Sequence, residues 1–341
     1  MVSLLGVLLR IGIGVGLLGY LTLSGAIDWA ALVNLGRSWP LTLLALAILA
    51  LDVGLTGYRL CILLRPRGLH LSITGSTRLT LIGQFFNSCL PGAAGGDLVR
   101  IYYAIGGDLT RKTEVATIML LDRAVAMFAL LVFPVIVLPW FPHVFQSMDV
   151  IPELIGGGAI LAGGLLCFVI VAFSDQVRNS TRLARLSNRL PLRDHIGRMW
   201  STIHAYRENK KTLLAVVGVS LVVHTLAIGT MLILASLMNP SGLVWEIALL
   251  IPLGMLANAL PLSPGGIGVG EAAFESLFRL AGLTGGAEIL LGWRVLTFLI
   301  GLVGLGFYLQ GRKAIISDQP LKSRLTEEGA ETAGSAIGRL S

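Results

Sequence analysis

The chain has 341 residues, of which 55% are hydrophobic and only 13% charged, and its mean hydropathy is +0.81. A soluble globular domain carries about twice that charged fraction. Composition therefore predicts an integral membrane protein, and the net charge of +7, with no basic face on a soluble fold, argues against nucleic-acid binding.

Eight apolar segments follow one another along the chain, at about 3–25, 40–64, 76–90, 115–139, 154–174, 212–236, 243–260 and 287–310. Most are long enough to cross a hydrocarbon core of roughly 30 Å as a helix. The third is short and is interrupted by Pro91–Asp97, and the seventh is interrupted at Pro261–Gly266. Amphipathic helices are expected to follow these breaks, at about 97–106 and 269–281. We expect one membrane domain over 1–312 and a disordered cytoplasmic tail over 313–341.

Loop charge predicts the topology. The loop at 65–78, the segment 175–211 and the start of the tail are rich in Lys and Arg, whereas 140–153 and 237–243 contain neither. Basic loops favour the cytoplasmic side. The broken third segment then begins and ends inside, and the broken seventh segment begins and ends outside. The sequence thus predicts an all-α polytopic protein with six full transmembrane helices and two re-entrant hairpins (eight spans if the hairpins are counted), with both termini cytoplasmic.

The two halves, about 1–140 and 150–312, carry the same residue types in the same order: an asparagine, a proline, a double glycine, a carboxylate and an arginine. These are Asn87, Pro91, Gly95, Gly96, Asp97 and Arg123 in the first half, and Asn258, Pro261, Gly265, Gly266, Glu271 and Arg294 in the second. Because the halves have opposite expected orientations, the pattern predicts an inverted-topology repeat, which is common in transporters.

Both breaks are candidate functional sites. Non-helical backbone survives at membrane depth only where protein buries it or water reaches it, and the N-termini of half-helices favour anions such as a lipid phosphate. Charged residues inside spans also indicate function by default. The candidate substrate-binding residues are Asn87, Asp97, Arg100, Asp122, Arg123, Asn258, Glu271, Glu275 and Arg294, and the candidate turn residues are Pro91, Gly95, Gly96, Pro261, Pro264, Gly265 and Gly266.

Structural roles are open for the same residues. Asp97 could cap the helix that follows Gly96, and Glu271 and Glu275 could complement a helix N-terminus. Arg123 and Arg294 could lie near helix ends and extend toward water. Asp52 and Arg59, two turns apart in the second span, could pair with each other or contact separate partners. No catalytic constellation, metal-ligand spacing or cofactor motif is expected.

The segment Asn87–Arg100 with Tyr102, together with Leu260–Glu271, resembles the flippase-like membrane region of lysylphosphatidylglycerol synthases over about residues 1–312. The resemblance implies movement of lipids with modified head groups between leaflets of a bacterial or archaeal cytoplasmic membrane. In those synthases a cytoplasmic domain aminoacylates phosphatidylglycerol. Only about 29 residues follow Arg312 here, so we expect this chain to lack that domain.

The leading hypothesis is therefore a lipid flippase and not an enzyme. Arg100, Arg123 and Arg294 would bind phosphate, and Asp97, Glu271 and Glu275 would contact a cationic or hydroxylated part of the head group. Asn87 and Asn258 would cap broken backbone. The alternatives are a secondary transporter of a small polar solute and a membrane enzyme acting on lipid-linked substrates. The candidate partners are membrane lipids, a separate lipid-modifying enzyme and a second copy of the chain.

Overall fold

The computed structural model describes residues 16, 19–23, 29–89, 95–105, 109–137, 163, 201–203, 205–206, 209–238, 244–259, 263 and 266–310. The expected spans at 3–25 and 154–174 lie mostly outside the described residues, as do residues 175–200 of the basic segment and the tail. The described part of the chain is 91% helical and contains no strand, which confirms the all-α prediction for these residues.

The elements in chain order are α2 (Trp29–Arg37), α3 (Trp39–Leu64), the 3₁₀ turn η1 (Arg65–Arg67), α4 (Ile73–Cys89), α5 (Gly95–Ala104), the 3₁₀ turn η2 (Leu109–Arg111), α6 (Lys112–Val137), α12 (Lys210–Met238), α13 (Val244–Asn258), α14 (Val269–Leu280) and α15 (Gly286–Leu309).

Four described helices are long and apolar enough to cross a membrane: α3, α6, α12 and α15. With 24 residues, α15 is about 36 Å long at the helical rise of 1.5 Å per residue, which exceeds a hydrocarbon core of roughly 30 Å. By contrast, α4 has 17 residues and α13 has 15. Each of these two is followed by a still shorter amphipathic helix, α5 or α14, as the sequence predicts.

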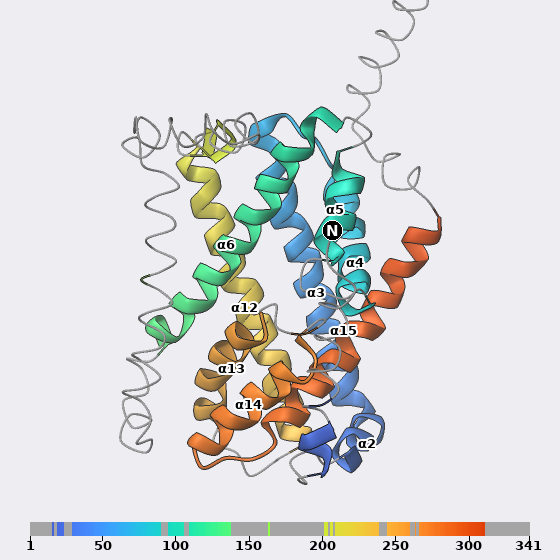
Figure 1. Ribbon diagram of the computed structural model, residues 1–341, viewed down its shortest axis with the longest axis vertical. Coiled ribbons are helices and arrows are strands. Elements are labelled where there is room, and N and C mark those ends of the chain that lie inside the picture. Colours follow the sequence, from blue (N-terminus) through green and yellow to red (C-terminus); the bar gives the residue numbers. More distant parts are fainter. Residues whose placement is uncertain are drawn as a thin grey trace, which may run out of the picture.

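The two short helix pairs occupy different ends of the molecule. In Figure 1, α4 and α5 lie in the upper part and α13 and α14 in the lower part, while α3 and α12 pack against each other through the centre. The helix α15 joins the two ends because it packs against α14 and also against α4. The contact between α15 and α4 depends on glycine, since a Cβ at Gly304 would overlap the carbonyl oxygen of Leu81.

Each short pair has its own apolar core. Around α13 and α14, the buried residues Phe274 and Phe278 pack with side chains of α12 and α15, among them Met231 and Leu290. At the other end, side chains of α3, α4, α6 and α12 form a second core around Tyr206. The phenol of Tyr206 donates a hydrogen bond to the carbonyl oxygen of Leu63 at the end of α3. The apolar packing thus fixes each short pair to long helices.

Candidate functional site

The first polar cluster begins at the N-terminus of α5. Asp97 lies in the first turn of α5 and is only 8% exposed. Its Oδ2 atom is 2.5 Å from Nε of Arg123 on α6, and its Oδ1 atom accepts a hydrogen bond of 3.3 Å from Nη1 of Arg100. The carboxylate therefore ties the start of α5 to α6.

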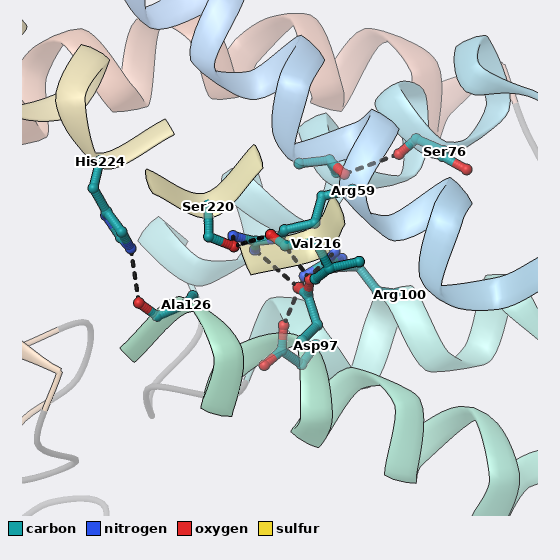
Figure 2. Close-up of polar contacts among 10 residues, drawn as sticks. Arg59, Ser76, Asp97, Arg100, Ala126, Val216, Ser220 and His224 are labelled. Atoms are coloured by element: carbon teal, nitrogen blue, oxygen red, sulfur yellow. Dashed lines mark hydrogen bonds and ion pairs between the residues drawn. The ribbon is translucent and has the colours of Figure 1, made fainter. Parts of the chain in front are cut away.

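A second aspartate extends this cluster to α3 and α12. Arg59 on α3 donates to both carboxylate oxygens of Asp122 on α6, at 2.8 and 3.2 Å, and its Nη1 atom lies 3.1 Å from Oγ of Ser220 on α12. Nη2 of Arg100 is 3.7 Å from Oδ2 of Asp122. Figure 2 shows Arg59, Asp97 and Arg100 converging beside Ser220. We call Arg59, Asp97, Arg100, Asp122 and Arg123 the first cluster.

These contacts show whether Asp52 and Arg59 pair with each other or contact separate partners, which the sequence left open. Arg59 bonds Asp122 and Ser220, which lie far from it in the sequence, and not Asp52 on its own helix. Oδ1 of Asp52 is buried without a hydrogen-bond partner among the described residues. Nearby, Nε2 of His224 on α12 is 2.8 Å from the carbonyl oxygen of Ala126, which links α12 to α6 (Figure 2).

The second cluster consists of Asn258, Glu271 and Arg294. Glu271 in the first turn of α14 is fully buried and pairs through Oε1 with Nε of Arg294 on α15. Its Oε2 atom accepts a hydrogen bond of 2.7 Å from the backbone N–H of Gly268. Nη2 of Arg294 donates to Oδ1 of Asn258 at the end of α13, at 2.8 Å. The cluster therefore joins three helices at one point.

Glu275, one turn further along α14, makes separate contacts. It accepts a hydrogen bond of 2.8 Å from Nε of Arg279, and its other oxygen is 3.5 Å from the backbone N–H of Ala287 near the start of α15. Glu275 is 4% exposed. The structure thus places Glu271 and Glu275 on one buried face of α14 but gives them different arginine partners.

The two halves bring the same residue types together at matching positions. Asn258 and Arg294 are 36 residues apart, as are Asn87 and Arg123. Oδ1 of Asn87 accepts a hydrogen bond of 2.9 Å from the N–H of Gly96, the residue before Asp97. In the second half, a Cβ on Gly270, the residue before Glu271, would overlap Oδ1 of Asn258. A Cβ on Gly266 would overlap the same atom, so it is the position before the carboxylate that matches Gly96 with Gly270.

A second pair of glycines also matches. Gly83 and Gly254 each lie four residues before the asparagine of their half. A Cβ added to Gly83 would be 2.5 Å from Cδ of Arg100, and one added to Gly254 would be 2.5 Å from Cε2 of Phe274. Arg100 and Phe274 each lie three residues after the carboxylate of their half. The recurring Gly-x-x-x-Asn pattern is a signal that the sequence analysis missed.

The predicted turn residues have different outcomes. Pro91, Pro261, Pro264 and Gly265 lie outside the described residues. Gly95 and Gly96 lie in the first turn of α5 and not in the connection before it, and both are buried. Gly266 has a φ angle of 74°, a conformation that favours glycine.

A comparison with protein families adds an independent observation. The family model for the lysylphosphatidylglycerol synthase TM region matches residues 7–304. The chain belongs to this family. Membership confirms the resemblance and, together with the apolar helices, identifies a multi-pass membrane protein with a lipid-related function. No curated protein and no solved structure matches this family member.

Proposed function

We propose that this family member is a transporter and not an enzyme, and that it moves phospholipids or lipids with other modified polar head groups between the leaflets of the cytoplasmic membrane. The observation that carries the proposal is the pair of polar clusters, each at the start of a short second helix, in a chain of a lipid-related membrane family. Buried charges in a membrane protein are costly and indicate function by default.

We further propose that α4–α5 and α13–α14 are re-entrant hairpins that enter from opposite membrane faces and belong to an inverted repeat. Their short helices support this, as does their position at opposite ends of the molecule in Figure 1. The matched contacts of Asn87 with Gly96 and of Asn258 with Gly270 also support it.

Exposed basic and tryptophan residues support one orientation of this arrangement in the membrane. Arg65, Lys112, Lys210 and Lys211 are exposed where α3 ends and α6 and α12 begin, which is the upper end in Figure 1. Exposed tryptophans lie on α2 and at the starts of α3 and α13, namely Trp29, Trp39 and Trp245. Basic residues favour the cytoplasmic side and tryptophans favour the interfaces. These features support a cytoplasmic upper end.

In this mechanism the head group crosses between the two clusters while the acyl chains stay in the bilayer. Each hairpin is tied to the next helix by a carboxylate–arginine pair, Asp97 with Arg123 and Glu271 with Arg294. The side chains of Arg123 and Arg294 are 40% and 23% exposed, so an incoming phosphate could reach them. A phosphate that accepts hydrogen bonds from these guanidinium groups would replace part of the carboxylate contact.

A scrambling assay tests this proposal. Purified protein is reconstituted into vesicles with fluorescent phospholipid, and a membrane-impermeant quencher reports the fraction of lipid that reaches the outer leaflet. The wild type should raise this fraction above that of protein-free vesicles, and Arg123→Met and Arg294→Met should slow the rise. Arg65→Met, an exposed arginine in η1, is the matched control. Wild-type vesicles that behave like protein-free vesicles would defeat the proposal.

A further inference from the structure

Among the described residues, Arg100 is a buried charged side chain whose presence packing alone does not explain. Arg100 in α5 and Phe274 in α14 occupy matching positions, and each covers the glycine of the Gly-x-x-x-Asn pattern in its half. Phe274 is fully buried, so an apolar side chain is sufficient to cover that glycine. Arg100 is also buried, with 8% exposure. Burying a cation is costly unless it is paired and hydrogen-bonded. An arginine at this position therefore has a role other than filling space.

The hydrogen bonds of Arg100 are incomplete. Among the described residues, only its Nη1 atom has an acceptor, Oδ1 of Asp97 at 3.3 Å. Nε and Nη2 are buried with no hydrogen-bond acceptor among the described residues, and Nη2 lies 3.7 Å from Oδ2 of Asp122. Buried donors of this kind nearly always have a partner. The side chain therefore has capacity for a further acceptor.

The neighbouring carboxylates are engaged more closely by other arginines. Asp97 is 2.5 Å from Arg123, and Asp122 accepts two hydrogen bonds from Arg59. In this network of direct contacts, three arginines share two aspartates. The N-terminus of α5 adds positive partial charge at the same point. The positive charge in these contacts therefore exceeds the negative charge, which favours binding of an anion.

We infer that Arg100 is the residue that recognises the phosphate of the transported lipid, so that the two halves of the repeat have different tasks. This inference rests on the proposed function, in which Arg123 and Arg294 contact the passing phosphate, and it assigns the selection of phosphate-bearing head groups to the first cluster. The second cluster has Phe274 in place of the arginine, and its Arg294 bonds both Glu271 and Asn258. Arg100 is therefore a specificity-determining residue: it favours lipids whose head group carries a phosphate and disfavours lipids whose head group is uncharged.

The test measures binding of three probes to the full-length protein in detergent: a short-chain phosphatidylglycerol, a diacylglycerol of the same chain length, and inorganic phosphate. The variants are Arg100→Met and Arg100→Phe, the latter with the residue found at the matching position, and Arg65→Met is the control. Loss of two charge-assisted hydrogen bonds should weaken phosphatidylglycerol binding about tenfold or more. Diacylglycerol binding should change less than about twofold, because it makes no such bonds. Arg100→Lys should recover part of the loss.

The outcomes distinguish failure of the Arg100 inference from failure of the proposed lipid transport. Equal phosphatidylglycerol affinity in the wild type and in folded Arg100→Met overturns the inference, as does an equal loss for both lipids. If neither variant folds, thermal stabilisation of the wild type decides: greater stabilisation by phosphatidylglycerol than by diacylglycerol supports the inference, and equal stabilisation overturns it. Competition by inorganic phosphate would show that the free anion is sufficient. Protein that binds through Arg100 but does not scramble lipid would defeat only the proposed function.

Discussion

The ion pair between Glu271 and Arg294 gives the sharpest stability prediction. Replacing Arg294 by Met leaves the Glu271 carboxylate fully buried, with the N–H of Gly268 as its remaining hydrogen-bond partner among the described residues, and removes the donor to Asn258. Breaking a buried pair from one side costs about 3–5 kcal/mol. Because the Arg294 side chain is 23% exposed, we expect a value near the lower end, a loss of about 3 kcal/mol in the free energy of unfolding.

Chemical denaturation in detergent, followed by circular dichroism, measures this loss. The double variant Glu271→Gln/Arg294→Met removes the unpaired charge and should regain about 1–2 kcal/mol relative to Arg294→Met alone, because a neutral amide is cheaper to bury than a carboxylate. Arg65→Met is the control, since Arg65 is exposed in η1 and its replacement leaves no buried carboxylate behind. That change should cost less than about 1 kcal/mol.

Two results would refute this reasoning. One is a loss below about 1 kcal/mol for Arg294→Met, which is the range of exposed ion pairs. The other is strict additivity of Glu271→Gln and Arg294→Met, because residues in one hydrogen-bonded network show coupling energies of about 0.5–3 kcal/mol. Either result would mean that the pair does not hold α14 against α15.

Three further predictions concern packing, capping and pH. Gly304→Ala should lower the thermal unfolding temperature by forcing α15 away from Leu81, whereas Gly306→Ala, with open space around it, should not. Asn87→Leu should cost about 1–3 kcal/mol in a denaturation curve by leaving the N–H of Gly96 without its acceptor. Burial raises the pKa of the Tyr206 phenol, so its stabilisation is present below the usual pKa of 10.0 and is lost as pH rises above it. Wild-type protein should therefore lose more stability than Tyr206→Phe in an alkaline titration.

Segment lengths and breaks were predictable because they depend on local sequence. An uninterrupted apolar run specifies a spanning helix, so 287–310 was expected and Gly286–Leu309 is found. Proline and glycine end such runs locally, so the short α4 and α13 were also expected. These features require no knowledge of which helices are neighbours.

The partners within the clusters were not predictable in the same way. Arg59 bonds Asp122 at a separation of 63 residues and Ser220 at a separation of 161. Hydropathy identifies these charges as intramembrane, but only helix packing decides which of them meet. Arg100 was grouped with Arg123 and Arg294 as an equivalent phosphate ligand. The structure gives Arg123 and Arg294 close carboxylate partners, whereas two donor atoms of Arg100 have no acceptor within the part of the chain that the structure describes.

The alignment of the two halves also needed the structure. Matching the double glycines pairs Gly96 with Gly266. The contacts of Gly83 with Arg100 and of Gly254 with Phe274 instead align the two carboxylates. This alignment pairs Gly96 with Gly270. The reason is the length of the connection, because Asn87 and Asp97 are separated by three fewer residues than Asn258 and Glu271. With this longer connection, Gly266 precedes α14, whereas Gly96 lies in the first turn of α5. The spacing from asparagine to arginine, in contrast, is the same in both halves.

The central claim is that a lipid, and not a water-soluble solute, passes between the clusters. The most direct measurement compares two substrates in the same proteoliposomes: transbilayer movement of fluorescent phosphatidylglycerol and uptake of radiolabelled glycerol 3-phosphate, its soluble head group. We predict protein-dependent movement of the lipid, slowed by Arg123→Met, with no uptake of glycerol 3-phosphate above protein-free vesicles. Uptake of the soluble compound without movement of the lipid would contradict the account.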